Sequence, residues 1–251
     1  MSEPGNLAGT RASPQPGGFT AEEARRAAEN CSAALRVLRG ERPARFRTVT
    51  TPTPAPRPRR TRDRDATRQR LLRAALELFT SLGFHGTTTP ALATRAGVAE
   101  GTIYRHFPGK EALYAEVVRS TARWAHGIVT DVESDRALPV LERIRRLGHR
   151  FVEAAERDPA AARLLFRRAG DAPSDPASRA ALADLHGGVE RMVAEAKAGG
   201  LVRPGPAELW AAVWLALVGF VAWKVAGREW EPGSATVEQA LQAAWDAIAA
   251  R

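Results

Sequence analysis

The stretch TPALATRAGVAEGTIYRHFP, residues 89–108, constrains the fold of this chain more than any other segment. It predicts a short helix over 89–96, a turn at Gly97-Val98 and a second short helix that starts at about Glu100. Glycine suits the turn because it adopts positive φ without the strain of a side chain. The residues expected to pack between the two helices are small or apolar: Leu92, Ala93, Gly97, Val98, Ile103 and Phe107. This pattern indicates a helix-turn-helix, although a helical hairpin in an alanine-rich protein would look similar.

The flanking segments favour the helix-turn-helix. Upstream, residues 67–84 place apolar side chains at helical spacing, and Gly83 is expected to end that helix. Three consecutive threonines then offer capping hydroxyls, and Pro90 fits the first turn of the next helix. Downstream, Phe107-Pro108-Gly109 ends the second short helix and begins a long one. The chain therefore predicts a three-helix head that continues into a fourth helix.

The net charge of +9 is unevenly distributed along the 251 residues. Residues 1–120 contain 20 Lys or Arg and 11 Asp or Glu, whereas residues 121–251 contain 17 of each. Excess cations neutralise phosphates, so a basic first part and a neutral second part suit a nucleic-acid-binding head on a separate body. Arg accounts for 34 of the 37 cations, which indicates compositional bias. Bias alone would not place the whole excess in one part.

Several classes of protein are disfavoured. A single cysteine, Cys31, excludes an intrachain disulfide and a Cys-rich zinc site, and the five histidines lack metal-ligand spacing. We find no nucleophile–base arrangement, paired-carboxylate site or cofactor fingerprint, so we expect neither an enzyme nor a bound cofactor or metal. The N-terminus is polar, and the longest apolar run, 209–223, is short for a membrane span. These features predict a soluble, cytoplasmic protein in which that run is a buried or interface helix.

Composition divides the chain into three regions. Residues 1–62 predict an N-terminal extension with one helix at about 21–39 and a basic, proline-rich linker, which either reaches DNA beside the head or is a solvated tail. Residues 63–122 form the head and residues 123–251 a helical body. The expected helices after the head cover 109–131, 136–157, 159–169, 176–199, 205–228 and 235–250. No alternating strand pattern occurs, so the predicted fold class is all-α.

The runs LLRAALELF, GFHGTTT and LATRAGVAEGTIYRHFPGKEAL, within residues 65–120, resemble the N-terminal domain of TetR-type (TetR/AcrR) transcriptional regulators. The rest of the chain resembles that family only in length and helical character. Two positions depart from the family pattern. Ala99 stands where the family commonly has a serine that caps the reading helix, and Leu92 stands where isoleucine is usual. Loss of such a cap costs about 0.5–2 kcal/mol.

The resemblance implies a set of DNA-contacting residues in the head: Thr88, Thr89, Gly101, Thr102, Tyr104, Arg105, His106 and Lys110. Arg105 would read a guanine through two parallel donors, and Thr88 and the helix start at Gly109-Lys110 would hold phosphates. Alternatives exist for three of these residues. Tyr104 would otherwise be a core aromatic, His106 a helix-end cap, and Lys110 a solvated charge.

For the body, the resemblance implies a homodimer through the helices at about 205–228 and 235–250 and a pocket for a small apolar or aromatic effector. Candidate lining residues are Trp124, Phe151, Leu165, Phe166 and Trp214, any of which would otherwise be core. The expected function is a ligand-released repressor that acts on a palindromic operator in double-stranded DNA. An activator or a non-specific architectural DNA binder is the alternative.

Overall fold

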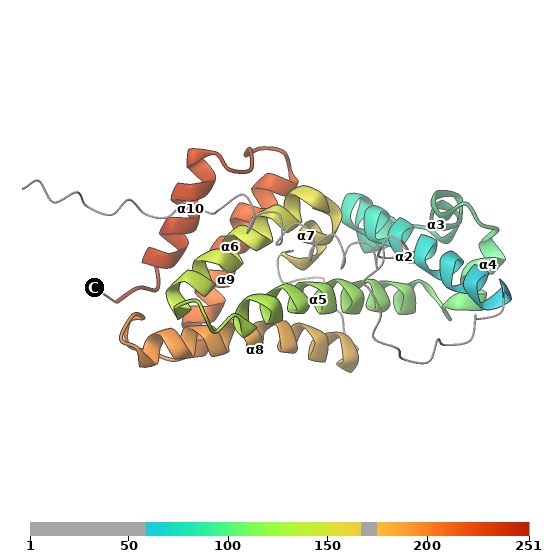
Figure 1. The fold of residues 1–251 in the computed structure, drawn as a ribbon. Helices are drawn as coiled ribbons and strands as arrows, with labels where there is room; N and C mark the ends of the chain where they lie inside the picture. Colours follow the sequence, from blue (N-terminus) through green and yellow to red (C-terminus); the bar gives the residue numbers. More distant parts are fainter. Residues whose placement is uncertain (1–58, 167–174, 251) are drawn as a thin grey trace, which may run out of the picture.

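The structure is a computed structural model that describes residues 59–166 and 175–250. Over these residues the chain folds into helices α2–α10, and the only β-type pairing among them is an isolated bridge between Val202 and Ala249. The all-α prediction is therefore confirmed for this part of the chain. The predicted helix at 21–39, Cys31 and most of the linker lie outside the described residues. A small head lies at one end of an elongated helical body (Figure 1).

The head consists of α2 (Arg59–Gly86), α3 (Thr89–Ala96) and α4 (Glu100–His106). Both short helices have the predicted bounds, but α2 begins eight residues before its predicted start at Thr67. Residues 59–66 are mostly charged, so no apolar stripe reveals their helix. As predicted, the regular helix is interrupted at Gly83, whose backbone is not helical. Its φ of 76° kinks the helix, and the chain then continues to Gly86.

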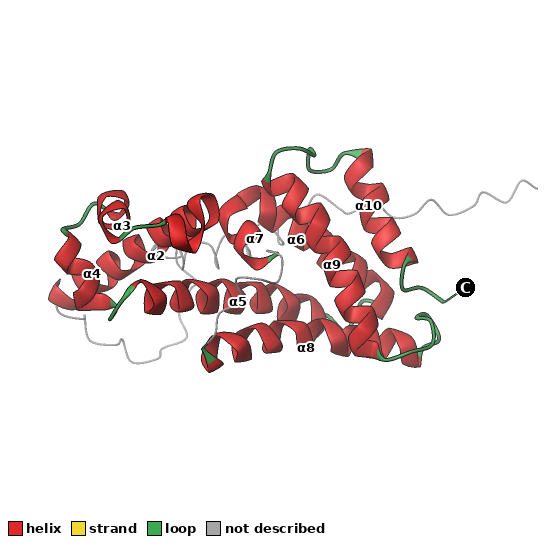
Figure 2. Cartoon of the chain, turned by 180° about the vertical axis from the view of Figure 1, so that it is seen from behind, coloured by secondary structure: helices red, strands yellow, loops and turns green. Residues whose placement is uncertain are grey.

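The head and the body share one helix, α5 (Lys110–Ser134), which runs from α4 into the body beside α8 (Pro176–Ala198), as Figures 1 and 2 show. The predicted boundary between residues 122 and 123 falls inside α5, at the fully buried Ala122. No linker therefore separates the two parts.

The body is completed by α6 (Val140–Arg157), α7 (Pro159–Leu165), α9 (Ala207–Ala226) and α10 (Ala235–Asp246). All six helices predicted after the head are confirmed, with bounds that differ by a few residues. The helix α9 packs against α6, α7, α8 and α10, so one face of α9 is buried within the body. The short helix α7 contacts both α9 and the head helix α2. The seven residues of α7 therefore connect the head with α9 in the body.

The helix α9 corrects one step of the sequence analysis. The apolar run ends at Trp223, but the helix continues to Ala226, because lysine is a good helix former and Lys224 does not stop it. By length and composition these 20 residues are sufficient to cross a membrane, so the argument from a short run is wrong. Half of the apolar window is buried against neighbouring helices. The burial of Trp214, Val218 and Val221, and not the length of α9, is what favours a helix packed within protein.

Candidate nucleic-acid interface

The two short helices of the head are joined by a tight turn that local contacts define. The Thr88 hydroxyl accepts a hydrogen bond from the Ala91 N–H at 3.4 Å and so caps α3. At the other end Gly97 adopts φ 65°, and the Val98 N–H donates to the Ala93 carbonyl at 3.0 Å. This left-handed residue after the helix is a Schellman-type end, which glycine favours because it has no Cβ to strain.

Five of the six predicted packing residues lie in the core beneath this turn, whereas Gly97 is exposed and forms the turn itself. Leu92, Ala93, Ile103 and Phe107 are buried, and Val98 is half-buried against the same core. The aliphatic face of α2, including Leu71 and Phe79, closes this core from the other side. One face of α4 is therefore held rigidly, which leaves its other face to solvent.

The outward face of α4 carries the side chains predicted to read DNA. Tyr104 is 55% exposed, so the alternative that it is a core aromatic is wrong. Gly101 and Arg105 are also exposed, and Thr102 and His106 are half-buried. A helix that buries its aliphatic side and exposes a phenol, a guanidinium and an imidazole can place hydrogen-bond donors in a major groove.

The charges around His106 are cationic. Burial, followed by the repulsion of Arg64 and Arg68, lowers the pKa of His106 below its usual value. His106 is therefore neutral at pH 7 in the free protein. Counted from the start of α2 at Arg59 to residue 122, the head contains eleven Lys or Arg and six Asp or Glu, so +5 of the +9 excess of the first 120 residues belongs to the head.

The start of α4 lacks the usual side-chain cap. Ala99 has the extended backbone of a capping residue, with φ −69° and ψ 144°, but no side-chain hydrogen bond. The neighbouring Glu100 accepts a hydrogen bond from the Thr89 hydroxyl at 3.0 Å. Thr89, predicted as a DNA contact, therefore joins α3 to α4, while Glu100 places a negative charge at the positive end of the α4 dipole.

Lys110 has a role that residue spacing does not reveal. Its Nζ donates to the carbonyls of Phe84 and Thr87, each at 3.0 Å, and lies 4.4 Å from the centroid of the Phe84 ring. The ammonium is therefore not a solvated charge, while the phosphate contact at the Gly109-Lys110 helix start stays a prediction. Two of the three ammonium donors already hold the connection between α2 and α3, so Lys110 is primarily a brace.

The candidate pocket residues of the body do not line one cavity. Trp214 lines a cavity of about 270 Å³ between α6, α9 and α10, together with residues that were not predicted, such as His149 and Glu238. Phe151 instead packs edge-to-face on Phe166 with ring centroids 5.6 Å apart. Trp124 is buried in the core, and its indole N–H has no hydrogen-bond partner among the described residues. Four of the five candidates, Trp124, Phe151, Leu165 and Phe166, therefore pack in the core, and an effector contact by any of them stays a prediction. Within the described part of the chain no group of metal-ligating side chains gathers.

Known proteins resemble this chain most strongly in the head. Residues 71–117 match the family model described as bacterial regulatory proteins, tetR family. The regulator RutR of Escherichia coli K12 is 44% identical over 54 residues, which is 22% of this chain and 26% of RutR. The repressor KstR2 of Mycobacterium tuberculosis H37Rv is 34% identical over 89 residues, 36% of this chain and 44% of KstR2. The aligned parts thus span at most about half of these curated relatives.

Solved structures resemble the chain over a longer range. A TetR family transcription regulator from Marinobacter aquaeolei VT8 aligns with a TM-score of 0.64 over 76% of this chain and all of that protein, at 24% identity. The structure of KstR2 from Mycobacterium tuberculosis aligns with a TM-score of 0.56 over 73% of this chain and 95% of that protein, at 23% identity. At this level of identity the likeness establishes the shared fold of head and body.

Proposed function

Because this chain belongs to the tetR family of bacterial regulatory proteins, we propose that it is a sequence-specific DNA-binding repressor of transcription. The observation that carries the proposal is the exposed face of α4, where Tyr104 and Arg105 project from a helix that the buried Ile103 anchors. RutR and KstR2 are a transcriptional regulator and a transcriptional repressor by name, and the family consists of regulators and not of enzymes. We expect the protein to act in the cytoplasm, bound to the nucleoid.

The proposed active form is a homodimer on a palindromic operator. Leu209, Leu217, Phe220 and Trp223 on α9 are each between 39% and 50% exposed, which is unusual for large apolar side chains. A second copy of the chain would cover this stripe and set two reading heads about a two-fold axis. Sedimentation should therefore give a dimer for the native chain and a monomer for Phe220→Glu, and a monomeric native chain would contradict this part of the proposal.

The proposed signal is a small apolar or aromatic effector bound in the body. The cavity beside Trp214 supports a bound effector, because Val218, Leu241 and Trp245 form an apolar wall in it. Its lining also includes the polar side chains Arg145, His149, Glu238 and Gln242. An effector in this cavity would release the operator if it binds more tightly to the conformation in which the distance between the two heads does not match the half-sites. Calorimetry with Trp214→Ala tests whether an identified effector uses this cavity.

The function is tested first with Tyr104→Ala in a mobility-shift assay on an operator selected from a random DNA pool. The loss of this exposed side chain should abolish operator binding without unfolding the head, since the ring contributes little to the core. Leu82→Ala is the matched control, because Leu82 is equally exposed in the head but lies on α2. Undiminished binding by the Tyr104 variant would exclude α4 as the reading helix.

A non-specific architectural DNA binder remains the alternative. At fixed salt, a specific regulator should prefer its operator over random DNA by about 10³-fold or more. Equal affinity for both, with a strong salt dependence, would favour the architectural alternative.

A further inference from the structure

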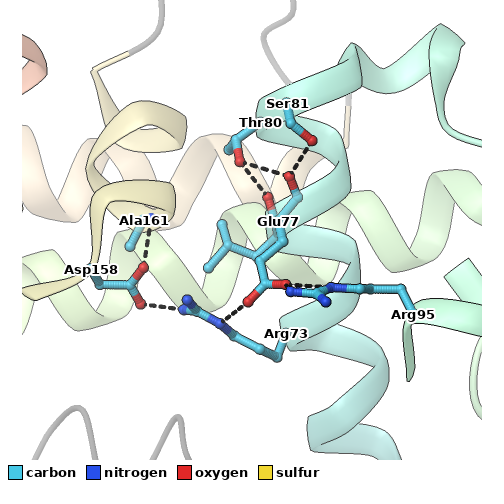
Figure 3. A network of polar contacts seen from close by, with 8 residues as sticks. Arg73, Glu77, Thr80, Ser81, Arg95, Asp158 and Ala161 are labelled. Carbon is cyan, nitrogen blue, oxygen red and sulfur yellow. Dashed lines mark hydrogen bonds and ion pairs between the residues drawn. The ribbon is translucent and has the colours of Figure 1, made fainter. Parts of the chain in front are cut away.

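The short helix α7 is attached to the head through a buried carboxylate. Asp158, whose side chain is only 4% exposed, precedes α7 and accepts the Ala161 N–H at 3.2 Å, so it caps the helix. Its other oxygen accepts a hydrogen bond from Arg73 of α2 at 2.6 Å. Figure 3 shows this carboxylate between the first turn of α7 and the guanidinium of Arg73. A single side chain therefore fixes the start of α7 to the head.

The contacts continue from Arg73 to the helix-turn-helix. Arg73 donates to Glu77 at 2.8 Å, and the other oxygen of Glu77 accepts from Arg95 at 2.7 Å (Figure 3). Burial raises the pKa of Glu77, but hydrogen bonds from Arg95 and Arg73 outweigh it, so the pKa lies below its usual value. Arg95 belongs to the last turn of α3, directly before the turn at Gly97. An alternating series of charges thus links α7 to the reading motif.

The opposite side of α7 is attached to α9. Arg163 donates to the carbonyl of Ala226, the last residue of α9, at 2.8 Å. Phe166, which ends α7, lies directly over Gly219 of α9, where an added Cβ would stand only 2.6 Å from the Phe166 ring. Because the Phe166 ring packs this closely on the backbone of α9, a shift of α7 along α9 would have to move the ring.

We propose that Arg73, Asp158 and Arg163 are positioning residues that hold the DNA-reading head at a set angle to α9 through α7. The inference rests on the proposed function, in which α9 joins two copies and the angle of each head decides the distance between the two reading helices. A shift of α7 on α9 has to move or break the contact between Asp158 and Arg73. Since that carboxylate is buried, its loss of a partner is costly, and the angle is held firmly.

Asp158→Asn separates this role from helix capping. Asparagine caps helices as well as aspartate and has nearly the same shape, but it lacks the charge that Arg73 pairs with. Glu142→Gln is the control, because it removes one carboxylate charge from an exposed ion pair of the body at Arg145, outside the series. Circular dichroism verifies the fold of each variant, and Arg73→Gln provides a second break in the contact at a residue that is 41% exposed.

The first readout is fluorescence anisotropy with three duplexes: the operator, the operator with one or two base pairs added between its half-sites, and a single half-site. Asp158→Asn should reduce the preference for the native spacing by about tenfold, the factor that corresponds to about 1.4 kcal/mol, with half-site affinity unchanged. The double variant Asp158→Asn with Arg73→Gln should lose no more of the spacing preference than either single variant, because both substitutions break the same contact. Native spacing preference in Asp158→Asn, or an equal loss of half-site affinity, would overturn the proposal.

The second readout needs no operator. A spin label at Leu82→Cys, in a Cys31→Ser background, reports the distance between the two heads of a dimer by pulsed electron resonance. The distance distribution should be narrow in the otherwise native chain and broader in Asp158→Asn, while Glu142→Gln leaves it narrow. Identical distributions in all three would refute the positioning role. If the native chain instead shows no preference for any palindrome, the proposed function itself fails, and this outcome is distinct.

Discussion

The missing cap at Ala99 leads to a prediction of increased stability. Ala99 already has the extended backbone that a capping residue requires, and it is exposed, so Ala99→Ser introduces no clash. The new hydroxyl would accept from the N–H of Gly101, which the first turn of a helix leaves without a helical partner, or would share the N–H of Thr102 with the Ala99 carbonyl. The substitution should therefore stabilise α4 relative to the native chain.

The magnitude follows from the bonds already present. Replacing a capping serine by alanine costs about 0.5–2 kcal/mol in general. Here the Thr102 N–H already donates to the Ala99 carbonyl at 2.8 Å, and Glu100 already places its charge near the α4 dipole. Since part of the stabilisation exists without the hydroxyl, we expect the lower part of the range, about 0.5–1 kcal/mol.

Amide hydrogen exchange is the suitable assay, because all six tryptophans lie beyond residue 122 and their fluorescence does not report on the head. A gain of about 0.5–1 kcal/mol slows exchange of the α4 amides by about two- to fivefold. Exchange in α9 should not change. Ala99→Val is the control, because valine fits the extended backbone but is a poor cap. Unchanged protection in the serine variant, or equal protection in the valine variant, would refute the capping argument.

Two further predictions concern the brace and the histidine of the head. Lys110→Met should lower the free energy of unfolding by about 1–3 kcal/mol, measured in urea titrations, because two charge-assisted hydrogen bonds to backbone carbonyls are lost. A decrease below about 0.5 kcal/mol would mean that the ammonium does not brace the head. The lowered pKa of His106 means that the folded state binds this proton less readily than the unfolded state, so its contribution to stability is present above about pH 6.5 and is lost as pH falls through the folded pKa. The native chain should therefore lose stability relative to His106→Gln between pH 7.5 and 5.5, and parallel pH profiles of the two proteins would count against this.

The sequence by itself determined the local elements of this protein. The bounds of α3 and α4, the capping hydroxyl of Thr88, the left-handed turn at Gly97 and the absence of a cap at Ala99 depend on groups a few residues apart. Helical periodicity and capping chemistry act over the same distance, so spacing alone identifies them. The first eight residues of α2, which are mostly charged, are not predicted to be helical, because helix propensity without an apolar stripe gives no periodic signal.

Only the tertiary structure decided how these elements act on one another. The partner of Arg73 is Asp158, 85 positions away, and Lys110 bonds carbonyls 23 and 26 positions before it. Nor does spacing separate a cavity wall at Trp214 from core packing at Phe151, since both side chains are large, apolar and buried. Such contacts depend on which helices pack together and on how deeply each side chain is buried, and neither can be read from residues close in sequence. The proposed reading of DNA depends on a local motif, but the angle between that motif and the body is a property of the whole fold.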